Sequence, residues 1–293
     1  MKTREASAAL LFVIVCAAVV FAAVVSGAQA EKKPFALMVG DDAPRLSVSK
    51  WVQGGPIRKL EPGHVYVLDF WATWCAPCVA SIPHVGELSK KYKSKATFIG
   101  MNVWQPDPAE VGPFVEKMGD KMPYAVALDA VPQGAEANVG KMAVGWMNAA
   151  GQRGIPAVFI VDQEGKVAWI GHPMEVDEPL EKIIEGTWDR DAYAKKHEAK
   201  MRIAAKAAPI EERLFAASNE GRWKDAIAAC DSLLALDPDE YAQAAVFKFQ
   251  MLLQRVGDPK AAYAYAKDLA NGPLGKEAWV LNGIAWYIVD PEF

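Results

Sequence analysis

Two cysteines separated by two residues, Cys75 and Cys78, constrain this chain more than any other feature. They follow an apolar run, Val65 to Phe70, that predicts a buried strand, and a helical pattern follows them. A cysteine at the start of a helix lies near unpaired backbone N–H groups and the positive end of the helix dipole, which favour thiolate over thiol. A second cysteine three residues later can attack a mixed disulfide formed by the first. This arrangement predicts a redox-active dithiol.

A zinc site is the main alternative for the cysteine pair. Zinc needs four ligands, and His64 and His84 are the only nearby candidates. A haem attachment site would need histidine directly after Cys78, where the chain has Val79. A purely structural disulfide is disfavoured across two residues at a helix start. The residues therefore favour a redox-active Cys75–Cys78 disulfide, with no metal and no further cofactor.

The composition limits the class of protein further. The 293 residues suit two domains, and the net charge of −4 without a basic patch argues against a nucleic-acid partner. Four cysteines are too few for a disulfide-stapled scaffold. Cys16 lies in an apolar run, and Cys230 lies in a helical run where a buried, inert thiol is expected.

The N-terminal residues have the pattern of a secretory signal. Lys2 and Arg4 precede an uncharged run over 8–25, and small residues at Ala28 and Ala30 suit a cleavage site. We expect cleavage after Ala30; an uncleaved N-terminal anchor is the competing interpretation, because 18 apolar residues approach the length of a membrane span. Either interpretation predicts that the rest of the chain is extracytoplasmic, in a bacterial periplasm.

The pattern of the first half predicts an α/β fold with a mixed sheet. The expected strands are 47–52, 57–60, 65–70, 96–103, 124–128, 157–161 and 166–170, and the expected helices are 79–92, 106–118, 139–149 and 177–185. Strands that alternate with helices and end in a hairpin imply a sheet covered on both faces.

The second half is expected to be all-helical. Residues 188–213 predict a long solvated helix that acts as a connector, and two units begin at Gly221 and Gly257, 36 residues apart. This period resembles tetratricopeptide repeats, which suggests a possible protein partner for the region. The predicted organisation is a signal or anchor over 1–30, an α/β domain over 31–187, the connecting helix over 188–213 and a helical domain over 214–293.

Asp69 lies within the apolar strand, six residues before Cys75. Burial raises the pKa of a carboxyl group, so Asp69 could exchange a proton with Cys78 near neutral pH. The alternative is a hydrogen-bonded structural acid. Among the nearby tryptophans, strand alternation predicts that Trp71 is in the core, whereas Trp74 is the better candidate for a docking surface, with Trp104 as a further candidate for its rim.

A second motif lies 81 residues after Cys75, at Ile155-Pro156 before a strand. Proline at a strand start can be purely structural. Together, the stretch Asp69 to Cys78 and the stretch Gly154 to Gly165 resemble the TlpA-like (ResA-like) thiol-disulfide oxidoreductases over about 39–187. The resemblance implies a thioredoxin-like fold, an extracytoplasmic location and exchange with protein thiols and disulfides.

By motif position, the resemblance makes Cys75 the attacking thiol, Cys78 the resolving thiol and Pro156 a cis proline, whose loop turns the backbone of Ile155 toward a substrate. Trp74 and Pro77 are expected to contact the substrate as well. Many ResA-like proteins have glutamate three residues after the second cysteine, where this chain has Ser81.

The sequence therefore predicts an exported thiol-disulfide oxidoreductase that reduces protein disulfides and receives electrons from an extracytoplasmic donor. A disulfide-forming oxidase is an alternative, because the motif does not fix the direction of exchange. A helical-repeat scaffold with an idle cysteine pair is another. A peroxidase is disfavoured, since no cysteine lies in a Pro-x-x-x-Thr/Ser-x-x-Cys setting.

Overall fold

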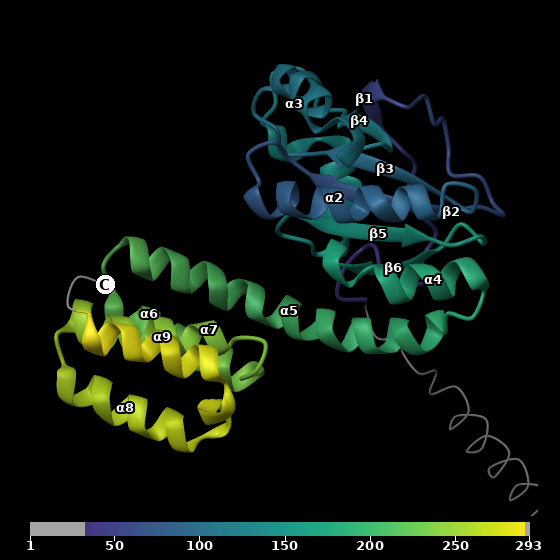
Figure 1. Ribbon diagram of the computed structural model, residues 1–293. Helices are drawn as coiled ribbons and strands as arrows, with labels where there is room; N and C mark the ends of the chain where they lie inside the picture. Colours follow the sequence, from purple (N-terminus) through teal and green to yellow (C-terminus); the bar gives the residue numbers. More distant parts are fainter. Residues whose placement is uncertain (1–32, 291–293) are drawn as a thin grey trace, which may run out of the picture. The chain divides into compact units, whose positions relative to one another are not determined.

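A six-stranded mixed sheet forms the first part of the protein (Figure 1). The computed structural model describes residues 33–290, so the predicted signal over 1–30 and Cys16 lie outside the described residues. The strand order is β1-β4-β3-β2-β5-β6. The strands are β1 (Val48–Gln53), β2 (Val65–Trp71), β3 (Ala96–Asn102), β4 (Ala125–Asp129), β5 (Ala157–Val161) and β6 (Val167–Gly171). β2, β3 and β4 are parallel, and β1, β5 and β6 are antiparallel to their neighbours, so the expected thioredoxin-like mixed sheet is confirmed.

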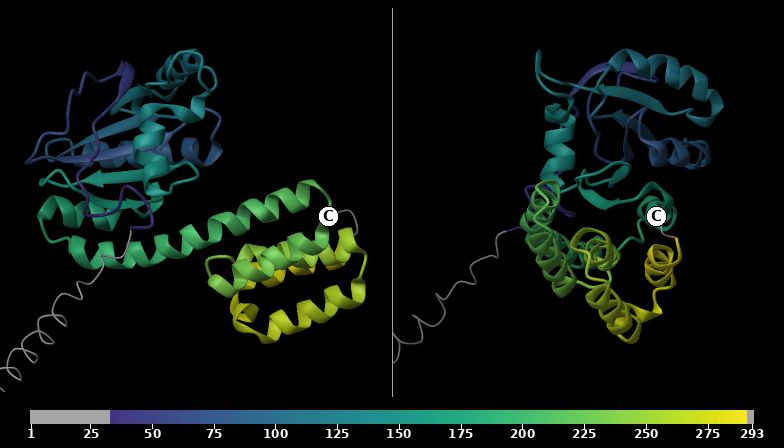
Figure 2. Two further views of the ribbon diagram at one scale, coloured as in Figure 1. Left: turned by 180° about the vertical axis from the view of Figure 1, so that it is seen from behind. Right: turned by 90° about the vertical axis from the view of Figure 1, so that its left-hand side faces the viewer.

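The central strand β2 is buried along its whole length, because both sheet faces are covered. One face of β2 packs against α2 (Ala76–Lys91) and α4 (Asp177–Glu185). The other face packs against the lead-in residues before β1 and a short helical segment over 142–150. Figure 2 shows these layers on the two sides of the sheet. Strand alternation therefore sorts the side chains of β2 between two separate cores.

The segment expected as one helix over 139–149 is instead three short pieces. They are the 3-10 turn η3 (Ala137–Val139), the π-helical turn η4 (Ala143–Met147) and the 3-10 turn η5 (Asn148–Ala150). The Asp129 carboxylate at the end of β4 accepts hydrogen bonds from the backbone N–H groups of Met142 (2.7 Å) and Ala143 (2.9 Å). A tertiary contact, which the local pattern does not contain, thus sets the start of this segment.

The expected strand over 57–60 is wrong. Residues 54–59 form no strand, and the Gly55–Pro56 peptide bond is cis. Pro56 and Pro62 flank the segment and lack the N–H donor that a sheet ladder requires. Ile57 and Leu60 still contribute to the second core as partly buried side chains.

The other elements lie close to their expected positions. α2 begins three residues earlier than expected, and the helix expected over 106–118 is a 3-10 turn, η1 (Pro108–Glu110), followed by α3 (Val111–Met118) and by a second turn, η2 (Gly119–Lys121). The predicted helix over 177–185 matches α4. The turn η6 (Pro173–Glu175) joins β6 to α4.

The described part of the second half is helical, as expected. It contains α5 (Arg190–Asn219), α6 (Trp223–Leu236), α7 (Ala242–Gln250), the π-helical η7 (Met251–Val256), α8 (Pro259–Asn271), the 3-10 turn η8 (Pro273–Lys276) and α9 (Ala278–Val289). α5 was expected to be a solvated connector ending at residue 213. It runs to Asn219 and buries Ala207 and Ala217 against α6, because its second half belongs to the helical core.

The two expected repeat units start in the same way. Gly221 (φ +70°) and Gly257 (φ +72°) both have left-handed backbone conformations that glycine adopts without strain, and each lies two residues before a helix. The tetratricopeptide resemblance itself and the domain boundaries remain predictions. Within residues 33–290, no helix is long and apolar enough to cross a membrane.

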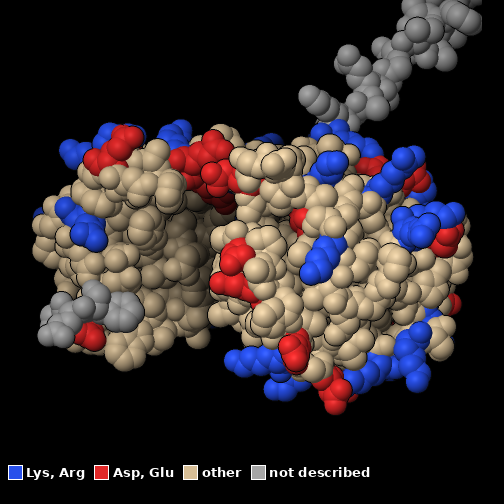
Figure 3. Space-filling model, turned by 90° about the horizontal axis from the view of Figure 1, so that it is seen from above, with Lys and Arg blue, Asp and Glu red and all other residues tan. Residues whose placement is uncertain are grey.

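Acidic and basic side chains are interspersed on the face of the protein that Figure 3 presents. Residues other than Lys, Arg, Asp and Glu cover most of the surface in this view. Such mixing produces no extended field of one sign on that face.

Gly140→Ala should destabilise the protein by about 2 kcal/mol. A Cβ atom at Gly140 would lie 2.0 Å from Oδ2 of Asp129, whose carboxylate is held by two backbone donors. The test is urea unfolding followed by circular dichroism. Gly145→Ala is the matched control in the same segment, because a Cβ there would meet no atom within 4 Å. Equal stability of the two variants would contradict the proposed role of Asp129.

Candidate active site

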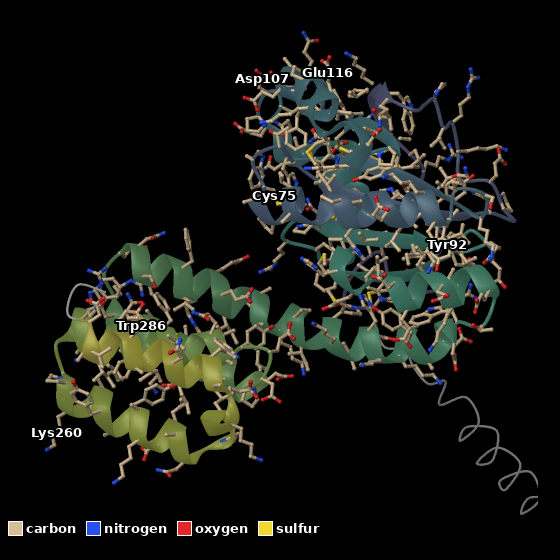
Figure 4. The ribbon with its side chains drawn as sticks, in the orientation of Figure 1. Cys75, Tyr92, Asp107, Glu116, Lys260 and Trp286 are labelled. Atoms are coloured by element: carbon tan, nitrogen blue, oxygen red, sulfur yellow. A yellow bond between two sulfur atoms is a disulfide. The ribbon has the colours of Figure 1, made fainter. Side chains whose placement is uncertain are left out.

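Cys75 caps the N-terminus of α2 and is disulfide-bonded to Cys78. Figure 4 shows Cys75 at one end of this helix and Tyr92 near the other. The Cys75 sulfur accepts a hydrogen bond from the backbone N–H of Cys78 at 3.2 Å. The first turn of α2 contains no acidic residue, so no carboxylate opposes a negative sulfur there. Pro77 is exposed in this turn, beside the disulfide.

The Ile155–Pro156 peptide bond is cis, which confirms the expectation for this motif. The carbonyl oxygen of Ile155 lies 3.6 Å from the Cys75 sulfur. β5 follows directly and pairs with β2, with Ala157 opposite Phe70, so the topology carries the proline loop to the end of β2 where the cysteines lie. The two motifs, 81 residues apart in sequence, therefore meet at one site.

A polar network fixes the loop that leads to Cys75. The Gln105 side chain accepts a hydrogen bond from the Thr73 N–H (3.0 Å) and donates to the Thr73 hydroxyl oxygen (2.9 Å). Gln105 also donates to the Glu110 carboxylate at 3.1 Å. Gln105 is buried, which strengthens these bonds by excluding water.

The sequence interpretation did not include Thr73, Gln105 or Glu110 in the site. A signal was present: β2 and β3 were both expected as strands, and the ends of adjacent parallel strands lie at the same sheet edge. The loops after these two strands therefore had to be neighbours. Which side chains bond across the loops depends on their conformations, which the pattern does not give.

Trp74 is the exposed aromatic residue of the cysteine loop. Its side chain is 56% exposed, and its indole N–H donates to the carbonyl oxygen of Trp104 at 2.9 Å. Trp104 has φ +53°, the one positive φ of a non-glycine residue within the described part of the chain. Such a backbone conformation is unfavourable for a bulky residue and is often found at functional sites. Trp71 is fully buried, in line with strand alternation.

Asp69 is buried in the middle of β2, with 1% of its surface exposed. Neither carboxylate oxygen has a hydrogen-bond partner, and burial raises the pKa of Asp69 to about 7. Val67 and Trp71, which lie on the same face of β2, belong to the core that also contains Cys78. Asp69 thus lies on the face of β2 that packs against the helix carrying Cys78.

α2 itself contributes no carboxylate to this core. Ser81 is buried one turn after Cys78, and its hydroxyl donates to the carbonyl oxygen of Cys78 at 2.9 Å. The other buried carboxyl group among residues 33–290, Asp129, is occupied by its two backbone donors. Asp69 is therefore the one buried carboxyl group of residues 33–290 that has no hydrogen-bond donor.

The two histidines considered as zinc ligands have other partners. His64 hydrogen-bonds the Thr97 hydroxyl at 2.8 Å, and His84 contacts the Asp177 carboxylate at 2.7 Å. In the region that the structure describes, no group of three or more His, Cys, Asp or Glu side chains is arranged to hold a metal. Cys230 is buried, and burial raises the pKa of its thiol to about 12. This agrees with the buried, inert thiol expected from the sequence.

A thioredoxin-like sheet with a disulfide at a helix start and a cis proline beside it defines a thiol-disulfide oxidoreductase. The comparison with known families agrees with this class, since residues 38–184 match the Redoxin family. The chain belongs to the Redoxin family.

The similar proteins include FixW and two proteins whose names describe thiol-disulfide exchange. Protein FixW of Rhizobium leguminosarum is 26% identical over 69% of this chain and 93% of its own length. The thiol-disulfide oxidoreductase ResA of Bacillus thuringiensis (strain Al Hakam) is 32% identical over 45% of this chain and 68% of its own length. The thiol:disulfide interchange protein HelX of Rhodobacter capsulatus is 28% identical over 52% of this chain and 80% of its own length. The names of ResA and HelX both describe thiol-disulfide exchange.

Gln105→Ala should lower the rate of disulfide exchange about tenfold, because the loop before Cys75 loses the side chain that holds it. The measurement is a single-turnover rate with a protein disulfide, with unfolding followed in parallel. Gln163→Ala is the matched control, since the Gln163 amide also bonds a backbone carbonyl, that of Ile183 at 3.0 Å, in a turn at the far end of β5. An equal effect of both variants on the rate would contradict a role in loop positioning.

Asp69→Asn should stabilise the protein at pH 8 and have a much smaller effect at pH 4. The pKa of Asp69 is raised from 3.8 to about 7 on folding, so the wild type loses stability as pH rises between these values. The loss is on the order of 4 kcal/mol. Urea unfolding of the oxidised protein at several pH values tests this. A difference in the free energy of unfolding between wild type and variant that stays constant from pH 4 to 8 would rule out an ionising Asp69.

Proposed function

We propose that this protein is an exported reductase of protein disulfides. The observation that carries the proposal is the disulfide at the start of α2, whose Cys75 sulfur lies 3.6 Å from the carbonyl oxygen that precedes the cis proline. A substrate cysteine seated at this loop would lie beside the sulfur that attacks it. The proposed substrate contacts are Trp74, which precedes Cys75, Pro77, which lies between the two cysteines, and the backbone of Ile155.

The exchange proceeds in two steps from the reduced dithiol. The Cys75 thiolate attacks a substrate disulfide, forms a mixed disulfide and releases one substrate thiolate, which takes up a proton. Cys78 then loses its proton to the Asp69 carboxylate and attacks the Cys75 sulfur. The second substrate thiolate leaves and is protonated. Two electrons have passed to the substrate, and the Cys75–Cys78 disulfide has formed.

The reduction potential of the Cys75–Cys78 pair distinguishes the two directions of exchange. A potential near −270 mV, about that of thioredoxin, would support a reductase that an extracytoplasmic dithiol donor must recharge. A potential near −120 mV, about that of DsbA, would instead support the alternative of a disulfide-forming oxidase. Equilibration in glutathione or dithiothreitol buffers, with Trp74 fluorescence as one readout, distinguishes the two.

An extracytoplasmic location is proposed from the signal pattern over 1–30. The measurement is the mass of the mature chain recovered from the periplasm. A chain that begins at residue 31 would support cleavage, a full-length membrane-bound chain would support an anchor, and recovery from the cytoplasm would contradict export.

The helical region is proposed to bind a protein partner or to select the substrate, as tetratricopeptide-like repeats would. The paired left-handed glycines before α6 and α8 support a repeat. Phe215 is 70% exposed and Trp279 49% exposed, which leaves aromatic contact surface available. In the alternative scaffold function, a partner would bind equally well to variants without the cysteines.

Cys75→Ser should abolish reduction of insulin disulfides, because the attacking sulfur is lost. Cys78→Ser should instead accumulate a mixed disulfide between Cys75 and the substrate, since the resolving thiol is missing. An insulin-reduction assay tests the first prediction, and mass spectrometry of the trapped adduct tests the second. Cys230→Ser is the control and should behave like the wild type. Unchanged insulin reduction by Cys75→Ser would overturn the proposed function.

A further inference from the structure

A pocket of about 570 Å³ lies beside the loop that leads to the cis proline. The residues that line it include three apolar ones, Phe35, Trp104 and Val139. The polar residues of the lining are three Asn or Gln residues and Arg153. A concave site of this size, with apolar walls and a few polar groups, is typical of a ligand-binding pocket.

The segment before β1 packs against this loop and forms one wall of the pocket. The Leu37 N–H donates a hydrogen bond to the carbonyl oxygen of Ala149 at 2.8 Å. Gly151 has φ +69°, and a Cβ atom there would lie 2.6 Å from the Phe35 ring. The ring therefore lies directly against the Gly151 backbone, which a larger residue would not permit. The wall is built by tertiary packing before any ligand arrives.

Two walls of the pocket connect directly to the redox site. The carbonyl oxygen of Trp104 accepts the indole N–H of Trp74, the residue before Cys75. On the other side, the loop runs from Gly151 to Ile155, whose carbonyl oxygen lies 3.6 Å from the Cys75 sulfur. Four residues of chain (155 minus 151) span at most about 14 Å. An extended substrate segment with its cysteine at Cys75 can therefore reach the pocket with a residue about two to four positions away.

The charges of the lining indicate what the pocket accepts. Among the described residues that line it, none is acidic, and the basic one, Arg153, pairs with the Glu211 carboxylate at 2.8 Å. Val139 is 44% exposed, so its apolar surface is available to a ligand. Carboxamide side chains both donate to and accept from a peptide backbone, whereas the apolar walls suit an uncharged side chain.

We propose that this pocket is a specificity site for an apolar side chain of the substrate polypeptide, located a few residues from the reactive cysteine in an extended segment. The inference rests on the proposed function and deepens it, because it names the kind of segment that Cys75 attacks. A tightly folded substrate cannot present such a segment, so flexible or unfolded cysteine-containing chains are the substrate class.

The test is the second-order rate constant for oxidation of the reduced protein by peptide disulfides. The peptides are symmetric disulfides of short Ser/Gly chains with one central cysteine, and a single leucine is moved along the chain on either side. Leucine about two to four residues from the cysteine, on one side, should raise the rate constant about tenfold over the peptide without it. Aspartate at the same position should give no increase.

Val139→Asp should lower this tenfold preference for leucine to about onefold, because a carboxylate then occupies the apolar wall. Val144→Asp is the matched control. Val144 is 46% exposed, lies in the same stretch of chain and does not line the pocket, so its variant should keep the full preference. The ratio of two rate constants from one sample does not depend on the fraction of protein that is folded.

The outcomes separate the inference from the proposed function. A reduced protein that reacts with no peptide disulfide would overturn both. Reaction with every peptide at one rate, a preference for aspartate over leucine, or equal ratios in the Val139→Asp and Val144→Asp variants would overturn the inference and leave the disulfide exchange intact.

Discussion

The burial of β2 on both faces and along both edges is the constraint on which the rest of the structure depends. β3 and β5 hydrogen-bond its edges, and two apolar cores cover its faces. β2 ends at Trp71, the chain leaves the sheet at Ala72, and the cysteines follow in the next loop. The same pairing carries the cis-proline loop before β5 to that end. The redox site is thus a consequence of strand order.

Much of this could be predicted from the sequence because the signals are local. The apolar run of β2, the cysteine spacing and the hairpin of β5 and β6 each depend on a few consecutive residues, and all were confirmed. Interactions between distant segments could not be predicted. The hydrogen bonds that Asp129 accepts from Met142 and Ala143 hold the start of the 142–150 segment, and the bonds between Gln105 and Thr73 join two loops. Both sets of bonds depend on side-chain conformations, which the periodicity of the sequence does not encode.

The same limit explains the two other differences. The run 57–60 has the residue types of a strand, yet prolines on each side leave it without a ladder partner. Residues 188–213 are rich in Ala, Lys and Glu, which favours a solvated helix, but the small residues in the second half of α5 allow α6 to pack closely. Alanine is compatible with a solvated helix and with a closely packed one, so only the packing partner distinguishes the two environments.

In the proposed mechanism, the acid–base chemistry of the site comes from the sheet and not from the helix. Many ResA-like proteins have glutamate three residues after the second cysteine, whereas α2 has Ser81 there, whose hydroxyl bonds its own helix. The available carboxylate is then Asp69, which lies in the strand beneath the cysteines. Burial among apolar side chains raises the pKa of Asp69 to about 7. An unpaired carboxylate in such a core costs stability at neutral pH. Retaining it in the central strand makes physical sense if that proton is used when Cys78 reacts.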